Sequence, residues 1–246
     1  MTIWFATGNA HKKAELSAIL QTHGVDCNLL IPKDAGLDFD PEETGTSFHE
    51  NALLKARELY ALLDKARPPL FRPGDPVIAD DSGICVDALD GRPGIYSARY
   101  TGRRSNEEKT SRRDAEDAEG IQENKVISNM KKLEASERNA LLLEELGDAA
   151  NRKARFVCAM VLMYTPDRFF IAQETMEGEI VKSIEQAKGA RGFGYDPVLF
   201  IPELGKTVAE LSEEQKNLSS HRGKAGKIIA EIIGNGDQGT GTREQK

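Results

Sequence analysis

Residues 77–100, VIADDSGICVDALDGRPGIYSARY, form the stretch around which the rest of the chain is interpreted. An apolar run over 77–79 ends in Asp80 and Asp81, and a Ser-Gly pair with the chemistry of a tight turn follows. We predict a strand that ends at the aspartates, then a turn and a second short strand over 84–86. Carboxylates at the end of a strand lie where open α/β sheets bind ligands. A solvated loop after the strand is the alternative, and this stretch alone slightly favours it.

The composition is that of a globular chain long enough for one large domain or two small lobes. The 246 residues are 39% hydrophobic and 30% charged. The net charge of -7 argues against bulk nucleic-acid binding, although a local basic cluster can still bind a small anion. Cys27, Cys85 and Cys158 lack zinc or redox spacing, so we predict buried free thiols in a reducing compartment. We expect a cytoplasmic protein, because the sequence has no signal-peptide pattern and no apolar segment long enough to span a membrane.

The first predicted helix, over 10–23, follows a strand over 2–6 and carries basic residues in its first turn. Its apolar stripe consists of Leu16, Ile19, Leu20 and His23. Lys12 lies one turn before Leu16 and falls on the same stripe. Positive side chains in a first turn oppose the helix dipole, and a bound anion would reverse that effect. A lysine that extends along an exposed helix end is an equally good interpretation.

The second predicted helix follows a strand over 25–31 and an acidic loop that contains Glu43. A capping box over 47–50 begins this helix, which runs to about Ala66. Its apolar stripe consists of Phe48, Ala52, Leu59 and Leu63. Lys55 lies on that stripe, and a lysine that faces a core needs a partner or a ligand. Glu43 is placed to act as a carboxylate at the rim of a cleft, or it is only solvated like the other acids of its loop.

The second half of the chain is predicted to hold a polar insertion and the remaining strands. Residues 103–138 are nearly all polar, which is typical of a surface excursion that is part helix and part flexible, and a short helix follows over 141–146. Strands are predicted over 155–164, 168–174, 176–184 and 198–201, the first two as a hairpin. We therefore place the folded α/β part of the chain over 1–233 with this insertion, and predict a disordered tail over 234–246.

Two glycine-containing segments near the C-terminus differ from the known nucleotide-binding motifs. Residues 189–197, GARGFGYDP, space their glycines as GxxGxG, which is not the dinucleotide fingerprint. Their backbone can approach a flat ligand closely, or the segment is a flexible loop with Phe193 packed under it. Residues 205–207, GKT, resemble the end of a P-loop, but Phe200 stands where the required earlier glycine would be. We therefore reject a P-loop.

The last two predicted helices carry further basic residues. A short helix over 212–217 holds Lys216, and Ser219 or Ser220 caps the final helix. The apolar stripe of the final helix consists of Ala225, Ile228, Ile229 and Ile232. Its first turn contains His221, Arg222 and Lys224. Basic residues again lie at the N-terminal end of a helix, where the helix dipole disfavours them. Two such helices support a bound anion better than one helix alone.

The unusual residues fall into an acidic group and a basic or hydrogen-bonding group. The acidic group is Glu43, Asp80 and Asp81. The other group is Thr7, Asn9, Lys12, Lys55, Lys216, His221 and Arg222. Carboxylates repel phosphate unless a divalent cation lies between them, and a few carboxylate ligands suit Mg2+. An aspartate near such an ion could take a proton from an attacking water. Phe193 could stack on a base, and His221 and Arg222 could donate hydrogen bonds to its edge.

Five segments, taken in order, resemble the motifs of the inosine triphosphate pyrophosphatase family, also called the XTP/dITP diphosphatases. They are FATGNAHKKAEL (5–16), EETGTSFHENALLKA (42–56), ADDSGICVDALDGRPGIYSARY (79–100), GFGYDPVLF (192–200) and GKTVAELSEEQKNLSSHRGKA (205–225). The resemblance covers most of the chain, and the motif set is highly specific. The insertion at 103–138 is longer than is typical for the family, and the tail is extra.

The resemblance implies a fold, an activity and partners. The family has an elongated mixed β-sheet with flanking helices, in two lobes around a central active-site cleft, and its members usually form homodimers. It hydrolyses ITP, dITP and XTP to the monophosphate and pyrophosphate, with one or more Mg2+ per subunit. No nucleic acid and no membrane is implied as a partner.

The resemblance also implies the site residues. Asp81 would be the catalytic base and, with Glu43, would bind the metal ion. The substrate-binding residues would be Thr7, Gly8, Asn9, Ala10, His11, Lys12, Lys55, Ser82, Phe193, Gly194, Tyr195, Asp196, Lys216, His221 and Arg222. Lys55 and Lys216 resemble the family's triphosphate-binding lysines, and residues 193–196 resemble its base platform. His221 and Arg222 resemble the residues that read the purine. Asp80 could bind a second metal ion, assist Asp81 or only hold the turn.

Hydrogen bonding explains why such a site would choose these bases. Hypoxanthine and xanthine carry an acceptor at C6, where adenine carries a donor. Donors from His221, Arg222 or nearby backbone would therefore reject adenine by about 10⁴ or more. Three other interpretations compete: a pyrophosphatase for modified pyrimidines, a nucleotide sensor without catalysis, and a structural scaffold. The His221–Arg222 pair favours purines, and the intact set of Glu43, Asp81 and Lys12 argues against a sensor. A scaffold would leave Lys55 on its apolar stripe unexplained.

Overall fold

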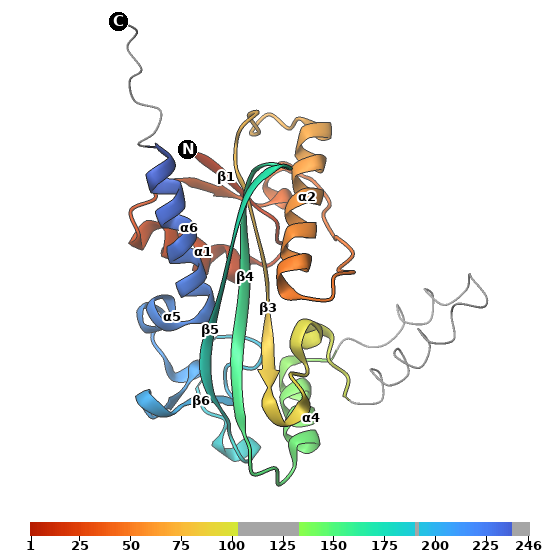
Figure 1. Cartoon of the computed structure of the whole chain (residues 1–246), viewed down its shortest axis with the longest axis vertical. Coiled ribbons are helices and arrows are strands. Elements are labelled where there is room, and N and C mark those ends of the chain that lie inside the picture. The colour runs from red at the N-terminus through yellow and green to blue at the C-terminus, as the bar shows by residue number, and fades with distance from the viewer. Residues whose placement is uncertain (103–132, 190–191, 238–246) are drawn as a thin grey trace, which may run out of the picture. The chain divides into compact units, whose positions relative to one another are not determined.

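The computed structural model describes residues 1–102, 133–189 and 192–237 (Figure 1). Its described strands are β1 (Thr2–Phe5), β2 (Asn28–Leu30), β3 (Val77–Val86), β4 (Lys153–Thr165), β5 (Arg168–Ile180), β6 (Leu199–Ile201) and β7 (Lys206–Thr207). They form one sheet in the order β2-β1-β3-β4-β5-β6-β7. Strand β1 is parallel to β2 and β3, whereas β6 is antiparallel to β5 and β7. The predicted α/β class with a mixed sheet and flanking helices is therefore confirmed.

The chain divides into two compact units. Within the described residues, the first unit covers 1–83, 156–176 and 212–237, and the second covers 84–102, 133–155, 177–189 and 192–211. The α-helices described are α1 (Ala10–Thr22), α2 (Phe48–Ala66), α4 (Ala135–Leu146), α5 (Glu213–Ser219) and α6 (His221–Asp237). Strands β3, β4 and β5 each contain residues of both units. The single domain of two lobes stays a prediction.

The first unit is built around β1, whose side chains alternate between the two faces of the sheet. Ile3 and Phe5 belong to a core cluster with α1 and α6, whereas Trp4 packs edge-on against Phe71 with 6.4 Å between ring centroids. Figure 1 shows α1 and α6 on one side of these strands and α2 on the other. The cluster also contains Leu16, Leu20, Ile78, Cys158, Met160, Leu162, Ala225, Ile229 and Ile233. Helices α1 and α6 thus pack against the strands through one shared core.

The predicted free thiols agree with the structure at two of three positions. Cys158 lies in the core cluster of the first unit, and Cys85 is also buried. Cys27 is only half-buried, and all three cysteines are free. Burial raises the pKa of the Cys158 thiol to about 12, so this side chain packs as a small neutral group.

Helix α2 begins as predicted at Ser47, whose Oγ accepts a hydrogen bond from the Glu50 N–H at 3.4 Å. The Glu50 carboxylate accepts hydrogen bonds from the N–H and hydroxyl of Thr46 instead of the Ser47 N–H, so only half of the predicted capping box forms. The predicted apolar stripe of Phe48, Ala52, Leu59 and Leu63 is buried. Lys55 on the same stripe is 7% exposed, which brings a charged group into the interior of the first unit.

The predicted turn at 82–83 is wrong, because Val77–Val86 is one continuous strand of 10 residues. Asp80 and Asp81 therefore lie inside a buried strand and not at its end, and they are 1% and 6% exposed. A strand can bury two carboxylates when nearby cations and donors compensate for the lost hydration. Those partners come from helices that are far away in the sequence, which the turn chemistry of Ser-Gly does not reveal.

In the second unit, helix α4 begins at Ala135, so the end of the predicted 103–138 excursion is helical, which agrees with an excursion that is part helix. Residues 103–132 lie outside the described residues. The predicted helix over 141–146 is the second half of α4, and Gly147 ends it as the sequence suggests. Leu142 and Leu146 are its buried leucines, which gives this helix an apolar face to pack.

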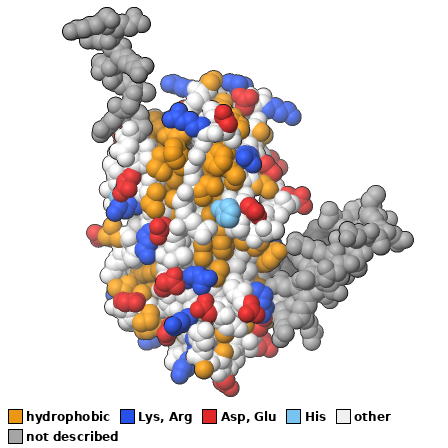
Figure 2. Space-filling model, in the orientation of Figure 1, with side chains coloured by type: hydrophobic (Ala, Val, Ile, Leu, Met, Phe, Trp, Pro, Cys, Tyr) orange, Lys and Arg blue, Asp and Glu red, His pale blue; other side chains and the backbone are white. Residues whose placement is uncertain are grey.

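The predicted strands of the second half are present with changed bounds. The runs over 168–174 and 176–184 form the single strand β5, which ends at Ile180 and follows β4 in the sheet. The strand predicted over 198–201 is β6. Lys206 and Thr207 form β7, so the GKT segment is part of the sheet and not a phosphate-binding loop. Figure 2 shows hydrophobic side chains among charged ones on one face, and Phe170 and Ile171 of β5 are 39% and 41% exposed.

The last helix is capped by Ser220, whose Oγ accepts a hydrogen bond from the Gly223 N–H at 3.0 Å. A Cβ at Gly223 would lie 1.9 Å from the carbonyl oxygen of Asn217, so only glycine lets α6 start this close to α5. Helix α6 continues to Asp237, which makes the predicted disordered tail wrong for residues 234–237. Residues 238–246 lie outside the described residues. Among the described helices, none has the length and apolar character needed to cross a bilayer.

Candidate active site

Asp80 and Asp81 point to opposite faces of β3, because successive side chains alternate along a strand. The Asp80 carboxylate lies 3.0 Å from Lys12 Nζ of α1 and 3.0 Å from Arg222 Nη2 of α6. The Asp81 carboxylate lies 2.9 Å from Lys55 Nζ of α2. One strand thus brings together cations from three helices, with a charged group on each of its faces.

The Lys55 ammonium lies among three oxygen atoms. Its Nζ is 2.7 Å from Glu43 Oε1 and 2.9 Å from Asp81 Oδ1, and it donates to the backbone carbonyl of Asp80 at 3.1 Å. Burial by itself would lower the pKa of Lys55, but the carboxylates of Asp81, Asp80 and Glu43 outweigh burial and raise it. Lys55 is therefore charged at neutral pH, and the prediction that it needs a partner is confirmed.

Asp81 is held by an amide as well as by the lysine. Asn51 Nδ2 donates to Asp81 Oδ2 at 3.3 Å, and Asn51 Oδ1 accepts a hydrogen bond from the Gly45 N–H at 2.8 Å. Burial raises the pKa of Asp81, and Lys55 acts in the opposite direction without cancelling that effect. The sequence reasoning missed Asn51, although its place one turn before Lys55 on α2 is a usable signal. A carboxylate with a raised pKa is suited to accept a proton.

Arg222 is 2% exposed, and the N–H groups of its guanidinium donate to other protein groups. Its Nε and Nη2 lie 3.2 Å and 3.0 Å from Asp80 Oδ2, its Nη1 lies 2.6 Å from Glu15 Oε2, and Nη2 also donates to Ser82 Oγ at 2.9 Å. Burial would raise the pKa of Asp80, but Lys12 and Arg222 outweigh burial and hold it well below its ordinary range. These contacts favour a supporting role for Arg222, and its contact with a purine base stays a prediction.

Glu15 is a site residue that the sequence reasoning missed. Its carboxylate bridges two cations, with Lys216 Nζ of α5 at 2.8 Å and Arg222 Nη1 at 2.6 Å. Burial opposes ionisation of Glu15, but Arg222 and Lys216 outweigh burial and lower the pKa. Glu15 follows Lys12 by three residues and shares its face of α1, which is the signal that could have found it. Lys216 therefore belongs to the group of Glu15 and Arg222, and its contact with a triphosphate stays a prediction.

His221, the first residue of α6, is stacked on the ring of Phe156. The ring centroids are 4.9 Å apart and the rings are inclined by 19°. His221 is 6% exposed, and among the described residues its Nδ1 has no hydrogen-bond partner. Burial first, and then the charges of Arg222 and Lys216, lower the pKa of His221 well below 6.5. The imidazole is therefore neutral at neutral pH, with one donor and one acceptor nitrogen, and it can form a hydrogen bond with a ligand.

The predicted substrate segment 7–12 forms the start of α1. Asn9 Oδ1 accepts hydrogen bonds from the N–H groups of His11 and Lys12 at 2.9 Å and 3.3 Å, and Thr7 Oγ1 accepts one from the Asn9 N–H at 3.1 Å. The exposed residues here are Gly8, Asn9, Ala10 and His11. Asn9 thus satisfies two N–H groups of the helix, so an anion at this end would compete with its side chain.

The predicted base platform, residues 193–196, lies in the second unit, whereas the other predicted site residues lie in the first. Asp196 Oδ2 accepts a hydrogen bond from the Phe193 N–H at 2.9 Å, and the Tyr195 hydroxyl donates to a backbone carbonyl of the same unit at 3.1 Å. Tyr195 and Asp196 are buried, while Phe193 and Gly194 are half-buried. The buried pair supports the loop, and the contact of Phe193 with a base stays a prediction.

A cation fits between Glu43 and Asp81. Both carboxylates already contact one positive group, Lys55 Nζ, at 2.7 Å and 2.9 Å. In the described ranges, no cluster of three or more Asp, Glu, His or Cys side chains is suited to a metal ion. Mg2+ keeps several waters and is usually held by one or two carboxylates together with substrate phosphates. The two carboxylates therefore suit Mg2+ better than a metal that demands a full set of protein ligands.

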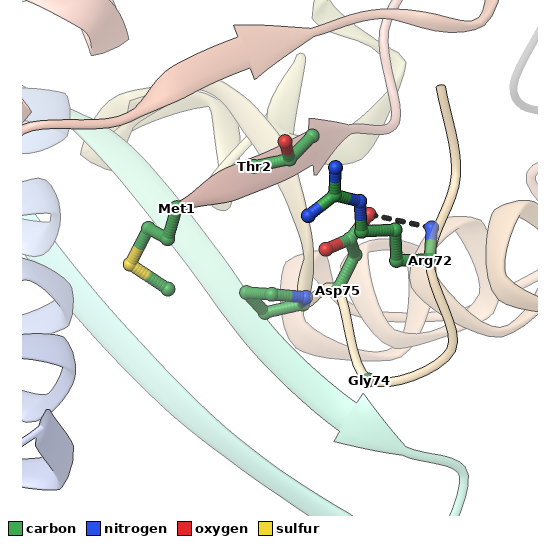
Figure 3. A pocket seen from close by; sticks show the side chains of 6 residues that line it. Met1, Thr2, Arg72, Gly74 and Asp75 are labelled. Atoms are coloured by element: carbon green, nitrogen blue, oxygen red, sulfur yellow. Dashed lines mark hydrogen bonds between the residues drawn. The ribbon is translucent and has the colours of Figure 1, made fainter. Parts of the chain in front are cut away.

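A pocket of about 380 Å³ lies at the start of β1 (Figure 3). It is lined by Met1, Thr2, Arg72, Gly74, Asp75 and Pro76. The dashed line in Figure 3 is the hydrogen bond that the Arg72 N–H donates to Asp75 Oδ2 at 2.8 Å. None of these residues belongs to the predicted site, so the pocket does not contribute to the functional assignment.

Comparison with known proteins identifies the family of the chain. Residues 3–129 and 118–232 match the Ham1 family. A Treponema denticola protein named dITP/XTP pyrophosphatase is 44% identical over 233 residues, which cover 95% of this chain and 98% of that protein. A Shigella flexneri protein of the same name is 39% identical over 235 residues, with 94% and 97% covered. The solved structure of the Staphylococcus aureus Ham1 protein matches with a TM-score of 0.69 and 32% identity, and covers 96% of this chain and 100% of that chain. The present chain therefore belongs to the Ham1 family.

Proposed function

We propose that this chain hydrolyses the non-canonical purine nucleotides ITP, dITP and XTP to the nucleoside monophosphate and pyrophosphate. The names of the relatives from Treponema denticola and Shigella flexneri support this substrate class. The observation that carries the proposal is the convergence of Glu43 and Asp81 on one cation position, next to a second group of cations around Asp80. A triphosphate and a divalent ion together match this arrangement of charges. The reaction would remove these nucleotides from the nucleotide pool.

Asp81 is the proposed proton acceptor. In the reaction a water oxygen bonds to a phosphorus atom of the linkage between the α- and β-phosphates, the bridging P–O bond breaks, and the water proton goes to Asp81. Asn51 donates to Asp81 Oδ2 and orients the carboxylate, whereas Lys55, which contacts Asp81 Oδ1, is proposed to turn to a phosphate when the substrate binds. Magnesium bound by Glu43 and Asp81 would neutralise charge that develops on the phosphate oxygens.

The lysines are proposed to bind the phosphates. Lys12 and Lys55 each contact an aspartate of β3, and a phosphate oxygen can take the place of a carboxylate oxygen as the acceptor. Asp80 keeps Lys12 and Arg222 in position from the opposite face of the strand. Its proposed role is positioning and not proton transfer, because its pKa is held well below the ordinary range by Lys12 and Arg222 against the effect of burial.

His221 is proposed to read the base. Its neutral ring offers one N–H donor, and hypoxanthine and xanthine offer a carbonyl oxygen at C6, where adenine has an amino group. Phe156 holds the imidazole plane by stacking, so the direction of its nitrogen atoms is fixed. A homodimer, a cytoplasmic location and the absence of nucleic-acid or membrane partners stay predictions.

Product analysis tests the proposal. Purified protein is incubated with dITP in the presence of Mg2+ or of EDTA, and pyrophosphate, orthophosphate and dIMP are quantified. We expect equal amounts of dIMP and pyrophosphate with Mg2+, and a loss of at least about 100-fold in rate with EDTA. Release of orthophosphate alone, or full turnover in EDTA, would contradict the proposed reaction. No turnover of any triphosphate would favour a nucleotide sensor.

A further inference from the structure

We propose that the Lys55 ammonium takes the place of the metal ion in the nucleotide-free protein, so that tight metal binding requires a phosphate that accepts Lys55. The inference rests on the proposed metal-assisted function and adds that tight metal binding depends on the bound nucleotide. It assigns Lys55 a second role besides phosphate binding, as a built-in competitor of the divalent ion.

The first argument is that Lys55 contacts both proposed metal ligands. Its Nζ lies 2.7 Å from Glu43 Oε1 and 2.9 Å from Asp81 Oδ1. A divalent ion held by these two carboxylates would lie next to the ammonium, and its charge would repel that group. The ion and the ammonium therefore compete for the same two ligands.

The second argument is that the ammonium has no spare donor. A lysine ammonium offers three hydrogens, and Lys55 uses them on Glu43, on Asp81 and on the backbone carbonyl of Asp80 at 3.1 Å. Lys55 is 7% exposed, so water does not readily replace a lost partner. An ion that takes both carboxylates away from Lys55 would leave a buried charge with one neutral acceptor.

The third argument is that a nucleotide phosphate removes the conflict. A phosphate oxygen is an anionic acceptor that can bind Lys55 while the ion takes Glu43 and Asp81. Metal and triphosphate then raise each other's affinity, because the coupling between two ligands is reciprocal. The expected consequence is that the free protein binds metal weakly and the nucleotide complex binds it well.

Lys12 provides the matched control. It is also a lysine beside β3, but it lies 3.0 Å from Asp80, whose carboxylate points to the opposite face of the strand from Asp81. Removing its charge changes the net charge near the site as much as removing that of Lys55. Only Lys55 contacts Glu43 and Asp81, so only its removal frees the proposed metal ligands.

The experiment measures Mn2+ binding to the nucleotide-free protein from the electron paramagnetic resonance signal of free Mn2+. We expect Lys55→Met and Lys55→Gln to bind Mn2+ at least about tenfold more tightly than the wild type, whereas Lys12→Met and the charge-conserving Lys55→Arg change the affinity less than about threefold. Lys55→Gln keeps an amide donor, so it replaces Lys55→Met if that variant does not fold. Thermal unfolding with and without Mn2+ verifies that each variant is folded.

The outcomes separate this inference from the proposed function. Equal Mn2+ affinity in the wild type and in both neutral Lys55 variants would overturn the competition, while metal-dependent release of pyrophosphate would still stand. A matching gain in Lys12→Met would overturn it too, because the effect would then be one of net charge. If no form of the protein bound Mn2+, even with an α,β-methylene analogue of ITP present, the metal site of the proposed function would be overturned as well.

Discussion

Arg222 Nη2 and Nε lie 3.0 Å and 3.2 Å from the same carboxylate oxygen of Asp80, Oδ2. The two residues are 142 positions apart in the chain. This pair joins the start of α6 to the middle of β3. Arg222 and Asp80 are 2% and 1% exposed, so neither charge has access to bulk water. The pair is therefore a structural support of the site, and it makes the site sensitive to changes on either side.

Arg222→Met should destabilise the protein strongly, because it leaves the buried carboxylates of Asp80 and Glu15 with one cationic partner fewer. Breaking a buried ion pair from one side typically costs about 3–5 kcal/mol. Urea unfolding of the wild type and the variant measures the change in the free energy of unfolding. The double variant Asp80→Asn with Arg222→Met should recover part of the loss. A loss below about 1 kcal/mol in the single variant would show that the pair is marginal.

Glu15→Gln should raise the KM for ITP by about tenfold and change kcat less. The carboxylate holds Lys216 at 2.8 Å and Arg222 at 2.6 Å, so its neutral replacement weakens the positioning of both cations. Removing an interaction that orients binding groups raises KM more than it lowers kcat. Steady-state kinetics check this, with Glu214→Gln on the exposed surface of α5 as the control. Equal losses in kcat for both variants would argue for a general effect on folding.

Asp81→Asn should fold and lose at least about 100-fold in turnover, since an amide cannot accept the water proton. In the wild type, kcat/KM should fall as the pH drops, because the base works only when ionised. Burial raises the pKa of Asp81 in the metal-free protein, and a bound Mg2+ would act in the opposite direction. Rate measurements over pH 4 to about 9 test both points. Full activity of the variant, or a rate that does not fall in acid, would exclude Asp81 as the base.

His221 should make the protein less stable as the pH falls. Burial and the charges of Arg222 and Lys216 lower the pKa of His221 in the fold, whereas the unfolded chain takes up a proton near pH 6.5. Its contribution to stability is therefore complete above about pH 6.5 and decreases below it, by up to about 1.4 kcal/mol per pH unit. Urea unfolding from pH 7 to about 5 should show this slope in the wild type and a smaller one in His221→Gln. The same slope in both proteins would refute the buried neutral ring.

The sequence predicts the helices that carry the site better than it predicts the strand between them. Helical periodicity placed Lys55 on the buried stripe of α2, and the structure confirms both its burial and its need for partners. The residue types of Ser82 and Gly83 suggested a turn, yet β3 continues through them. Lys12 and Arg222 compensate for the burial of Asp80 within this strand, which is a long-range effect that local turn chemistry cannot show.

The role of Glu15 also depends on long-range contacts that the sequence does not reveal. In the sequence it is one acid on a polar helix face, and its importance arises only because α5 and α6 bring Lys216 and Arg222 to its two oxygen atoms. Asn51 is similar, since its amide matters only when β3 presents Asp81 beside α2. The motifs thus located most of the charged residues, but which carboxylate each cation contacts follows from the packing of the helices on the sheet.

The ratio of kcat/KM for ITP to that for ATP tests the central claim most directly, because the two nucleotides differ only in the C6 substituent of the base and in the hydrogen that N1 carries in ITP. Pyrophosphate release is measured with each nucleotide under the same Mg2+ concentration. A site that donates hydrogen bonds to a C6 carbonyl predicts a ratio of about 10⁴ or more. A ratio near one, or faster turnover of a pyrimidine triphosphate, would contradict the account of His221 as the residue that selects the base.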